Sequence, residues 1–276
     1  MTRLKTPLRY PGGKSKATTR MSPYFPTKFE VTHYREPFLG GGSVALWMTQ
    51  NYNLESVWVN DLYWPLYNFW KHLRDRGEEL SNALKETKNN FSTPDKARDL
   101  FLKANRELSD KETTDFEKAV NFWIVNKCSF SGLTEISSFS EQASNGCFTL
   151  NGIENLKHYS KMIKNWKITC QSYENLLSPQ ESCFVYLDPP YEIEKGLYGK
   201  GRSMHNGFDH DLFAKRCNAN VDNLTMAVSY NNTDAIKDRF DGWKENTFAL
   251  TYSMNNQSKK YRNMQGSRLE LLLTNY

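Results

Sequence analysis

The sequence lacks long hydrophobic runs and has few cysteines, and each shortage argues against a class of protein. Its 276 residues contain no apolar stretch of roughly 18 residues, the length that a membrane-spanning helix needs. The first residues also lack the apolar core of a signal peptide. The five cysteines are widely spaced and form no C-x-x-C pair, which indicates free, mostly buried thiols instead of disulfides or a zinc site. We therefore expect a cytoplasmic protein.

Acidic residues are missing from the first 29 positions, which carry seven lysines and arginines. A second basic cluster follows near the other end of the sequence, at Lys259, Lys260, Arg262 and Arg268. A solvated basic face explains either cluster alone. Two clusters together, in a chain with 14% aromatic residues and a net charge of +5, favour a polyanionic partner.

Short apolar runs rich in β-branched and aromatic residues alternate with helical patterns, which is typical of a parallel sheet covered by helices. The runs are 29–38, 56–60, 167–171, 183–187, 224–230, 247–253 and 269–274. The last two have no helical pattern between them, so we expect them to form a hairpin.

The middle of the chain, residues 63–165, is mainly helical in pattern. Ser92–Asp95 is predicted to begin a helix, with Pro94 in the first turn. The residues between Cys128 and Leu150 are rich in Ser, Gly and Asn, which predicts loops or a small hairpin. We therefore expect a doubly wound α/β domain, formed by residues 1–62 and 166–276, that carries a helical insertion at 63–165.

The segment FVYLDPPYE places an acid, two prolines and a tyrosine directly after an apolar strand. Proline fixes φ and restricts the residue before it, so Asp188, Pro189 and Pro190 form a stiff, extended turn. Ligands bind at the carboxyl ends of strands in open α/β sheets. A rigid turn with an acid cap explains D-P-P alone, but the buried strand before it and Tyr191 after it favour a functional site.

A glycine-rich turn follows an earlier strand, in REPFLGGGSVAL. Glycines let the backbone approach a ligand closely, and Ser43 is a candidate N-cap for the helix that follows. Asp61 ends the next strand about 20 residues later, which is the spacing at which an acid binds ribose hydroxyls in related nucleotide folds. An acid at a strand end is also a common helix cap, so either role fits Asp61.

The segment LRYPGGKSK has a glycine pair before Lys-Ser, as the end of a phosphate-binding loop does. A Walker A loop requires glycine where Leu8 stands, and a strand before it. Neither condition is met, so the segment is not predicted to be a phosphate-binding loop.

Taken together, these segments resemble the Dam-type (D12 class, alpha-group) DNA adenine-N6 methyltransferases. D-P-P-Y resembles the catalytic motif, E-P-F-x-G-x-G the S-adenosylmethionine loop, and R-Y-P-G-G-K the N-terminal segment that closes over this cofactor. ITCQSYENLL, NKCSFSGLTE and the ending YRNMQGSRLELLLTNY resemble further family segments in the family's order. The resemblance covers nearly the whole chain. It implies a seven-stranded methyltransferase sheet whose insertion is a target-recognition domain.

The resemblance also implies a role for individual residues. For S-adenosylmethionine it implies Tyr10, Lys14, Glu36, Pro37, Phe38, Gly40, Gly42, Ser43, Asp61, Tyr173 and Asp188. For double-stranded DNA, together with the basic clusters, it implies Arg9, Asn126, Lys127, Phe130, Ser131, Gly132, Thr134, Glu135, Lys259, Lys260 and Arg262. For catalysis it implies Asp188, Pro189, Pro190 and Tyr191, without a metal.

The implied chemistry makes a poor nucleophile reactive by orienting it. The lone pair of the adenine amino nitrogen is delocalised into the ring. The Asp188 carboxylate and the Pro189 carbonyl are expected to hold the amino hydrogens and turn this lone pair towards the methyl group, with Tyr191 stacking on the base. Since duplex DNA hides the nitrogen, the base must be flipped out. We expect S-adenosyl-L-homocysteine as the product, and a monomer or weak dimer in a prokaryotic or phage-infected cell.

Two alternatives stay open on the sequence. Cytosine-N4 methylation uses the same chemistry, but its motif more often begins with serine, so Asp188 favours adenine. An inactive DNA-binding module of the same fold is the second, against which the intact Lys14, Asp61, Asp188 and Tyr191 argue. The recognition sequence is not predicted to be GATC, because Glu135 stands where members reading GATC have a basic residue.

The segment from His205 to Asp211 carries two histidines and two aspartates. Its spacing fits neither a zinc nor a calcium template. We therefore expect Asp209 to be a helix cap.

Overall fold

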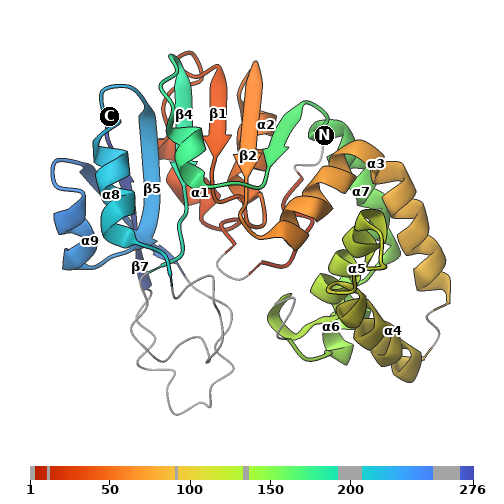
Figure 1. Cartoon of the computed structure of the whole chain (residues 1–276). Coiled ribbons are helices and arrows are strands. Elements are labelled where there is room, and N and C mark those ends of the chain that lie inside the picture. The colour runs from red at the N-terminus through yellow and green to blue at the C-terminus, as the bar shows by residue number, and fades with distance from the viewer. Residues whose placement is uncertain (1–3, 11–12, 91–92, 133–136, 192–206, 251–267) are drawn as a thin grey trace, which may run out of the picture.

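The structure is a computed structural model that describes residues 4–10, 13–90, 93–132, 137–191, 207–250 and 268–276. Within these ranges seven strands form one sheet in the order β3-β2-β1-β4-β5-β7-β6 (Figure 1). The strands are β1 (His33–Glu36), β2 (Ser56–Asn60), β3 (Trp166–Thr169), β4 (Cys183–Leu187), β5 (Thr225–Asn231), β6 (Lys244–Leu250) and β7 (Arg268–Thr274). Neighbours from β3 to β5 are parallel, whereas β7 is antiparallel to β5 and β6. The predicted doubly wound sheet and its C-terminal hairpin are confirmed.

The strand order reverses between β1 and β4, which lie side by side in the middle of the sheet. The segments that follow β1, β2 and β4 therefore meet at one edge of the sheet. They are the glycine turn, Asp61 and the acid-proline turn at 188–190. Ligands of open α/β sheets bind at such a point, so the topology brings together the segments that the sequence singled out.

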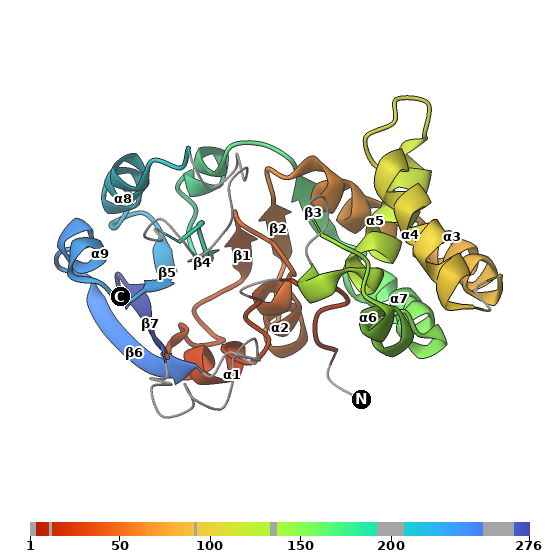
Figure 2. The ribbon, with the colours of Figure 1, turned by 90° about the horizontal axis from the view of Figure 1, so that it is seen from below.

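Helices cover both faces of the sheet, because side chains along a strand alternate between the faces. The helices outside the insertion are α1 (Thr18–Met21), α2 (Ser43–Asn51), α8 (His210–Asn218) and α9 (Asp234–Arg239), with 3-10 turns η1 (Ser22–Tyr24) and η3 (Tyr173–Leu177). In β4, Phe184 and Tyr186 pack with α1 and α2, whereas Val185 and Leu187 pack with α8 and α9. Figure 2 shows the two helix pairs on opposite sides of the sheet. This two-sided burial explains the continuous apolar run at 183–187.

The insertion is a helical block beside β2 and β3, and Figures 1 and 2 both place it on that side of the sheet. Its elements are α3 (Trp64–Asn89), α4 (Pro94–Glu107), α5 (Asp115–Cys128), η2 (Phe130–Gly132), α6 (Glu141–Cys147) and α7 (Leu150–Met162). The long α3 lies against α7, where a Cβ added to Gly77 would be 2.3 Å from the Ser160 Cβ. Ser81 Oγ donates to the Ile153 carbonyl across the same contact at 3.1 Å. The helical character predicted for 63–165 is therefore confirmed.

Side-chain caps explain where several helices begin. The Thr93 side chain accepts from Lys96 N at the start of α4, with Pro94 in the first turn as predicted. Thr114 and Glu117 form a capping box at α5, which satisfies two backbone donors reciprocally. The Asp209 carboxylate accepts from Leu212 N at 2.8 Å, so the predicted cap of α8 is confirmed.

Three expectations about local structure were wrong. Residues 141–147 are helical instead of looped, because Ser140 caps α6 by accepting from Ala143 N. The strand β1 is confined to 33–36, and Phe29 lies exposed before it. The strand β6 begins at Lys244, three residues earlier than predicted, because its pairing with β7 extends to Thr274.

The five cysteines are free; Cys128, Cys183 and Cys217 are buried, and Cys147 and Cys170 are half-buried. In the part of the chain that the structure describes, no helix combines the length and the apolar character needed to cross a membrane.

Candidate active site

The N-terminal segment lies across the glycine turn and is tied to it and to the helix α2 that follows. Leu4 N donates to Gln50 Oε1 at 2.8 Å, and Gln50 Nε2 returns a bond to the Leu4 carbonyl at 2.9 Å. Thr6 Oγ1 donates to the Gly41 carbonyl. The Tyr10 ring then lies so close that a Cβ added to Gly40 would be 3.0 Å from Tyr10 Cε1. Glycine is therefore needed at 40 for the tyrosine to cover the turn.

The glycine turn has a backbone that side chains would not tolerate. Gly40 and Gly42 have φ values of 49° and 66°, in the left-handed region that favours glycine. Gly42 is itself the N-cap residue of α2 and offers no side chain. The prediction that Ser43 caps this helix was wrong, because Ser43 is the first helical residue and its Oγ pairs with Ser15 Oγ at 2.9 Å.

Asp61 both caps the chain after β2 and holds the glycine turn. Its Oδ1 accepts from Tyr63 N at 3.0 Å, and its Oδ2 accepts from Gly40 N at 2.8 Å. Burial raises its pKa to about 6, although these two hydrogen bonds favour the ionised form and lower it. The sequence left open whether Asp61 caps a helix or binds ribose hydroxyls. The geometry shows the capping hydrogen bond to Tyr63 N and a second hydrogen bond to the glycine turn at Gly40 N.

Aromatic rings form a wall next to the glycine turn. Phe38 and Tyr173 are stacked, with ring centroids 5.5 Å apart and planes at 29°. Phe208 packs against both, at 5.8 Å from Phe38 and 5.9 Å from Tyr173. All three are partly exposed, so the wall presents ring surface to a ligand. The sequence analysis missed Phe208, which carries no motif of its own.

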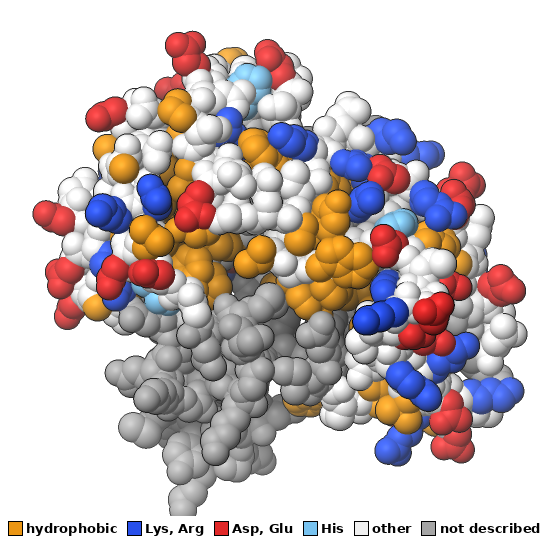
Figure 3. Space-filling view, viewed as in Figure 1, with side chains coloured by type: hydrophobic (Ala, Val, Ile, Leu, Met, Phe, Trp, Pro, Cys, Tyr) orange, Lys and Arg blue, Asp and Glu red, His pale blue; other side chains and the backbone are white. Residues whose placement is uncertain are grey.

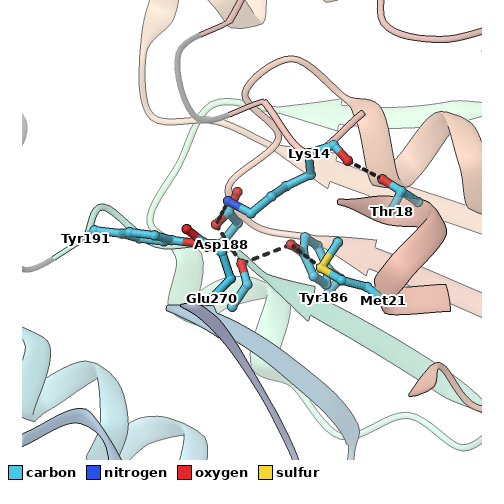
Figure 4. A network of polar contacts seen from close by, with 8 residues as sticks. Lys14, Thr18, Met21, Tyr186, Asp188, Tyr191 and Glu270 are labelled. Atoms are coloured by element: carbon cyan, nitrogen blue, oxygen red, sulfur yellow. Dashed lines mark hydrogen bonds and ion pairs between the residues drawn. The ribbon is translucent and has the colours of Figure 1, made fainter. Parts of the chain in front are cut away.

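Asp188 follows β4, and its carboxylate is held from two sides. Its Oδ1 accepts from Lys14 Nζ at 2.8 Å and from Ser229 Oγ at 2.7 Å (Figure 4). Tyr186 donates to the same serine oxygen at 2.9 Å. The Asp188 side chain is 22% exposed, and no other described residue donates a hydrogen bond to its Oδ2. One carboxylate oxygen is thus anchored, and the second has no hydrogen-bond donor among the described residues.

Tyr191 is positioned by a second acid, Glu270 of β7. The Tyr191 hydroxyl donates to Glu270 Oε2 at 2.6 Å, and Lys14 Nζ lies 4.9 Å from the centre of the Tyr191 ring. Burial is the largest single influence on Lys14 and lowers its pKa, but the charge of Asp188, the nearby Tyr186 and Glu270 and the hydrogen bond to Asp188 together raise it by more, so the ammonium stays charged. Glu270 was missed as a site residue, although the motif E-L-L-x-x-N-Y contains it. Only the strand pairing shows that it reaches the Asp188 turn.

Tyr10 connects the two halves of the site. It lies against Gly40 and Gly41 of the glycine turn, and besides desolvation the charges of Asp61, Tyr63 and Asp188 act to raise the pKa of its hydroxyl. The site therefore joins an acid-proline turn, a lysine, a glycine turn, a strand-end acid and an aromatic wall.

Comparison with known proteins decides which family has this arrangement. Residues 10–256 match the family of D12 class N6 adenine-specific DNA methyltransferases. The chain belongs to this family. The enzymes of the family transfer a methyl group from S-adenosylmethionine to adenine N6 in DNA, which confirms the resemblance, the fold and the enzyme class expected from the sequence. The cytosine-N4 alternative is not favoured.

Similar proteins include two that match this chain over nearly its whole length and one that matches about two thirds of it. The chain is 24% identical to Type II methyltransferase M.MjaIII of Methanocaldococcus jannaschii, over 98% of both sequences. It is 21% identical to Type II methyltransferase M1.LlaDCHI of Lactococcus lactis subsp. cremoris, over 97% of this chain and 94% of the relative. It is 23% identical to the DNA adenine methylase of Haemophilus influenzae, over 67% of this chain and 63% of the relative.

Two residues of the E-P-F motif are buried in this methyltransferase. Glu36 accepts a hydrogen bond from the Tyr34 hydroxyl at 2.6 Å, and burial raises its pKa well above the usual value, which favours the neutral acid. Pro37 is buried, and its carbonyl accepts from Asn60 Nδ2 at 3.1 Å. The structure thus places Glu36 inside the protein beneath the site, whereas Phe38 lies on the aromatic wall.

The residues expected to contact DNA differ in exposure. Phe130 is 66% exposed, whereas Asn126 is fully buried. Burial lowers the pKa of Lys127 to about 8, and its Nζ lies 5.2 Å from the centre of the Trp123 ring. Other predicted DNA contacts lie outside the described residues: Thr134, Glu135, Lys259, Lys260 and Arg262, together with the side chain of Ser131.

The described acidic and histidine side chains around α8 pair with other protein side chains. Asp211 pairs with Arg239 Nε at 2.6 Å, and His210 Nδ1 is 2.7 Å from the Tyr230 hydroxyl. Among the residues described, no group of three His, Cys, Asp or Glu side chains is arranged to hold a metal ion.

Proposed function

We propose that this enzyme methylates N6 of a flipped-out adenine in duplex DNA with Asp188, Pro189 and Tyr191 as its catalytic residues. The position of Asp188 is the observation that carries the proposal. Its Oδ1 is anchored by Lys14 and Ser229, and its Oδ2 is left to accept an amino hydrogen of the base. The Pro189 carbonyl accepts the second hydrogen, and the Tyr191 ring stacks on the base. Orientation in a prebuilt polar site supplies the rate, without a covalent nucleophile or a metal.

The residues of the site fit S-adenosylmethionine. When bound, the cofactor supplies a methyl group on an electrophilic sulfonium centre. The Asp61 carboxylate suits ribose hydroxyls as an acceptor, and the wall of Phe38 and Tyr173 suits the flat adenine. Tyr10 covers the glycine turn, and Lys14 neutralises Asp188 beside the place of transfer. The product is S-adenosyl-L-homocysteine.

The insertion at 63–165 serves as the target-recognition domain, and residues 1–62 and 166–276 form the catalytic domain. Half-buried Lys127 in the last turn of α5 and exposed Phe130 in η2 lie on the side of the insertion that joins the N-terminal segment. Figure 3 shows hydrophobic side chains gathered across the middle of one face, between the sheet and the insertion, with charged side chains around them. Such a surface favours contact with an unstacked base, while basic residues contact phosphates.

The test is methyl transfer from labelled S-adenosylmethionine to DNA by purified enzyme, followed by methylation-sensitive sequencing. We expect N6-methyladenine in one sequence context. Asp188→Ala should reduce turnover at least about 100-fold, the loss typical of removing one preorganised contact, while DNA binding is kept. Asp211→Ala is the matched control, since Asp211 is an exposed acid that pairs with Arg239 on α9.

Near-normal turnover by Asp188→Ala would refute its assigned role. Methylated cytosine in the sequenced DNA would refute the adenine assignment. Binding of DNA without methyl transfer by the wild type would indicate an inactive module of this fold.

A further inference from the structure

Asn126 lies in the last turn of α5, and its side chain joins two segments that are distant in the sequence. It is fully buried, and its amide makes three hydrogen bonds. Oδ1 accepts from Arg9 N at 2.9 Å, and Nδ2 donates to the Arg9 carbonyl at 2.7 Å. Nδ2 also donates to the Gly132 carbonyl at 3.0 Å. The amide thus pairs with both backbone polar groups of Arg9, as a neighbouring strand does.

Further contacts pack the same two segments together. Arg9 Nη1 donates to the Ser129 carbonyl at 2.6 Å. Gly132 has a φ of 75°, and a Cβ added there would lie 2.4 Å from the Arg9 carbonyl oxygen. The backbone at 132 therefore rests directly on the backbone at 9. We call Arg9, Asn126, Ser129 and Gly132 the clasp.

The clasp continues directly into the cofactor side of the site. Tyr10, the residue after Arg9, lies on Gly40 and Gly41 of the glycine turn. The Tyr10 carbonyl accepts from Gly13 N at 3.0 Å, and Lys14 then reaches Asp188. On its other side, the clasp ends at the exposed Phe130 and the segment expected to read DNA. One buried side chain therefore holds the cofactor segment and the DNA-reading segment in register.

We propose that Asn126 is a positioning residue that couples DNA recognition to cofactor binding, which rests on the proposed function. A displacement of Gly132 relative to Arg9 leaves buried polar groups of the amide or the backbone unsatisfied, so the two segments keep one relative arrangement. A ligand that orders one segment then orders the other, and the second ligand binds at a lower entropic cost. By linkage, DNA raises the affinity for the cofactor by the same factor that the cofactor raises the affinity for DNA.

The test measures how many fold DNA changes the affinity for sinefungin, an unreactive analogue of the cofactor. The Kd of sinefungin is measured without DNA and with unmethylated duplex DNA that contains the enzyme's target sequence. For the wild type we expect DNA to lower the Kd of sinefungin at least about 5-fold, the lower end of typical coupling. Asn126→Ala should bring this factor close to one. The matched control is Asn121→Ala, because Asn121 is a buried residue of the same helix whose Nδ2 donates to Glu107 within the insertion, at 3.0 Å.

A merely structural role predicts another pattern. Asn126→Ala would then melt at a lower temperature but keep the wild-type factor, and that outcome refutes the proposal. Hydrogen exchange on the wild type needs neither variant nor DNA: sinefungin should slow exchange in residues 126–132 as well as at Arg9. Protection that stops at Arg9 also refutes the coupling. If the wild type methylates DNA but DNA leaves the Kd of sinefungin unchanged, this inference alone is overturned. If the wild type transfers no methyl group, the proposed function is overturned.

Discussion

Protonation of Asp61 should stabilise the fold and weaken cofactor binding at the same time. Burial raises its folded pKa from 3.8 to about 6, so the native state binds this proton more tightly than the unfolded chain does. The stability due to this proton is complete below pH 3.8 and is lost as the pH rises through 6. At neutral pH the enzyme thus keeps a partly desolvated anion that opposes folding.

The two pKa values give the size of the effect. Lowering the pH from 7 to 5 should raise the free energy of unfolding through Asp61 by about 1.3 kcal/mol. If ribose hydroxyls donate to the ionised carboxylate, the same change should weaken cofactor binding about 10-fold, because about one enzyme molecule in eleven keeps the anion at pH 5.

Urea unfolding and calorimetric binding of S-adenosyl-L-homocysteine, each at pH 5 and 7, measure both effects. Asp61→Asn is the reference for each. The asparagine amide also loses one backbone hydrogen bond, but that loss is the same at both pH values. The difference in unfolding free energy between wild type and variant should therefore change between pH 5 and 7 only through protonation of Asp61. If the difference in unfolding free energy between wild type and Asp61→Asn stays constant between pH 5 and 7, and the ratio of their Kd values does too, Asp61 does not titrate in this range and the reasoning fails.

Two further predictions concern Tyr191 and the glycine turn. Tyr191→Phe and Glu270→Gln should each lower kcat while leaving the KM for the cofactor unchanged. The double variant should lose less than the sum, because Tyr191→Phe removes the hydrogen bond that Glu270→Gln weakens by making its acceptor neutral; additive losses in this cycle would contradict the pairing. Gly42→Ala should destabilise the fold by about 1–3 kcal/mol, since its Cβ would lie 2.7 Å from the Trp70 ring at a positive φ. Thermal unfolding measures this loss against Gly146→Ala, a helical position with no atom within 4 Å of the added Cβ, and equal melting temperatures would refute it.

The motifs in the sequence predicted most of the fold because each reports a local constraint. An apolar run followed by Asp-Pro-Pro requires a buried strand and a rigid turn, and β4 ends at Leu187 as expected. The pair of strands without an intervening helix became the hairpin of β6 and β7. Local patterns failed at 141–147, where a single capping serine outweighed a loop-like composition, and at Ser43, where the left-handed Gly42 took the N-cap position.

The sequence by itself determined the family, the order of the segments and the residue types of the site, because adjacent residues carry the motifs. Only the tertiary structure decided which of these residues act on one another. Ser229 and Glu270 reach Asp188 and Tyr191 because β5 pairs with β4 and β7 pairs with β5. Asn126 looks like a DNA contact in sequence, but the packing buries its amide against Arg9, 117 positions away. Pairings over such distances depend on the whole core, which no local pattern contains.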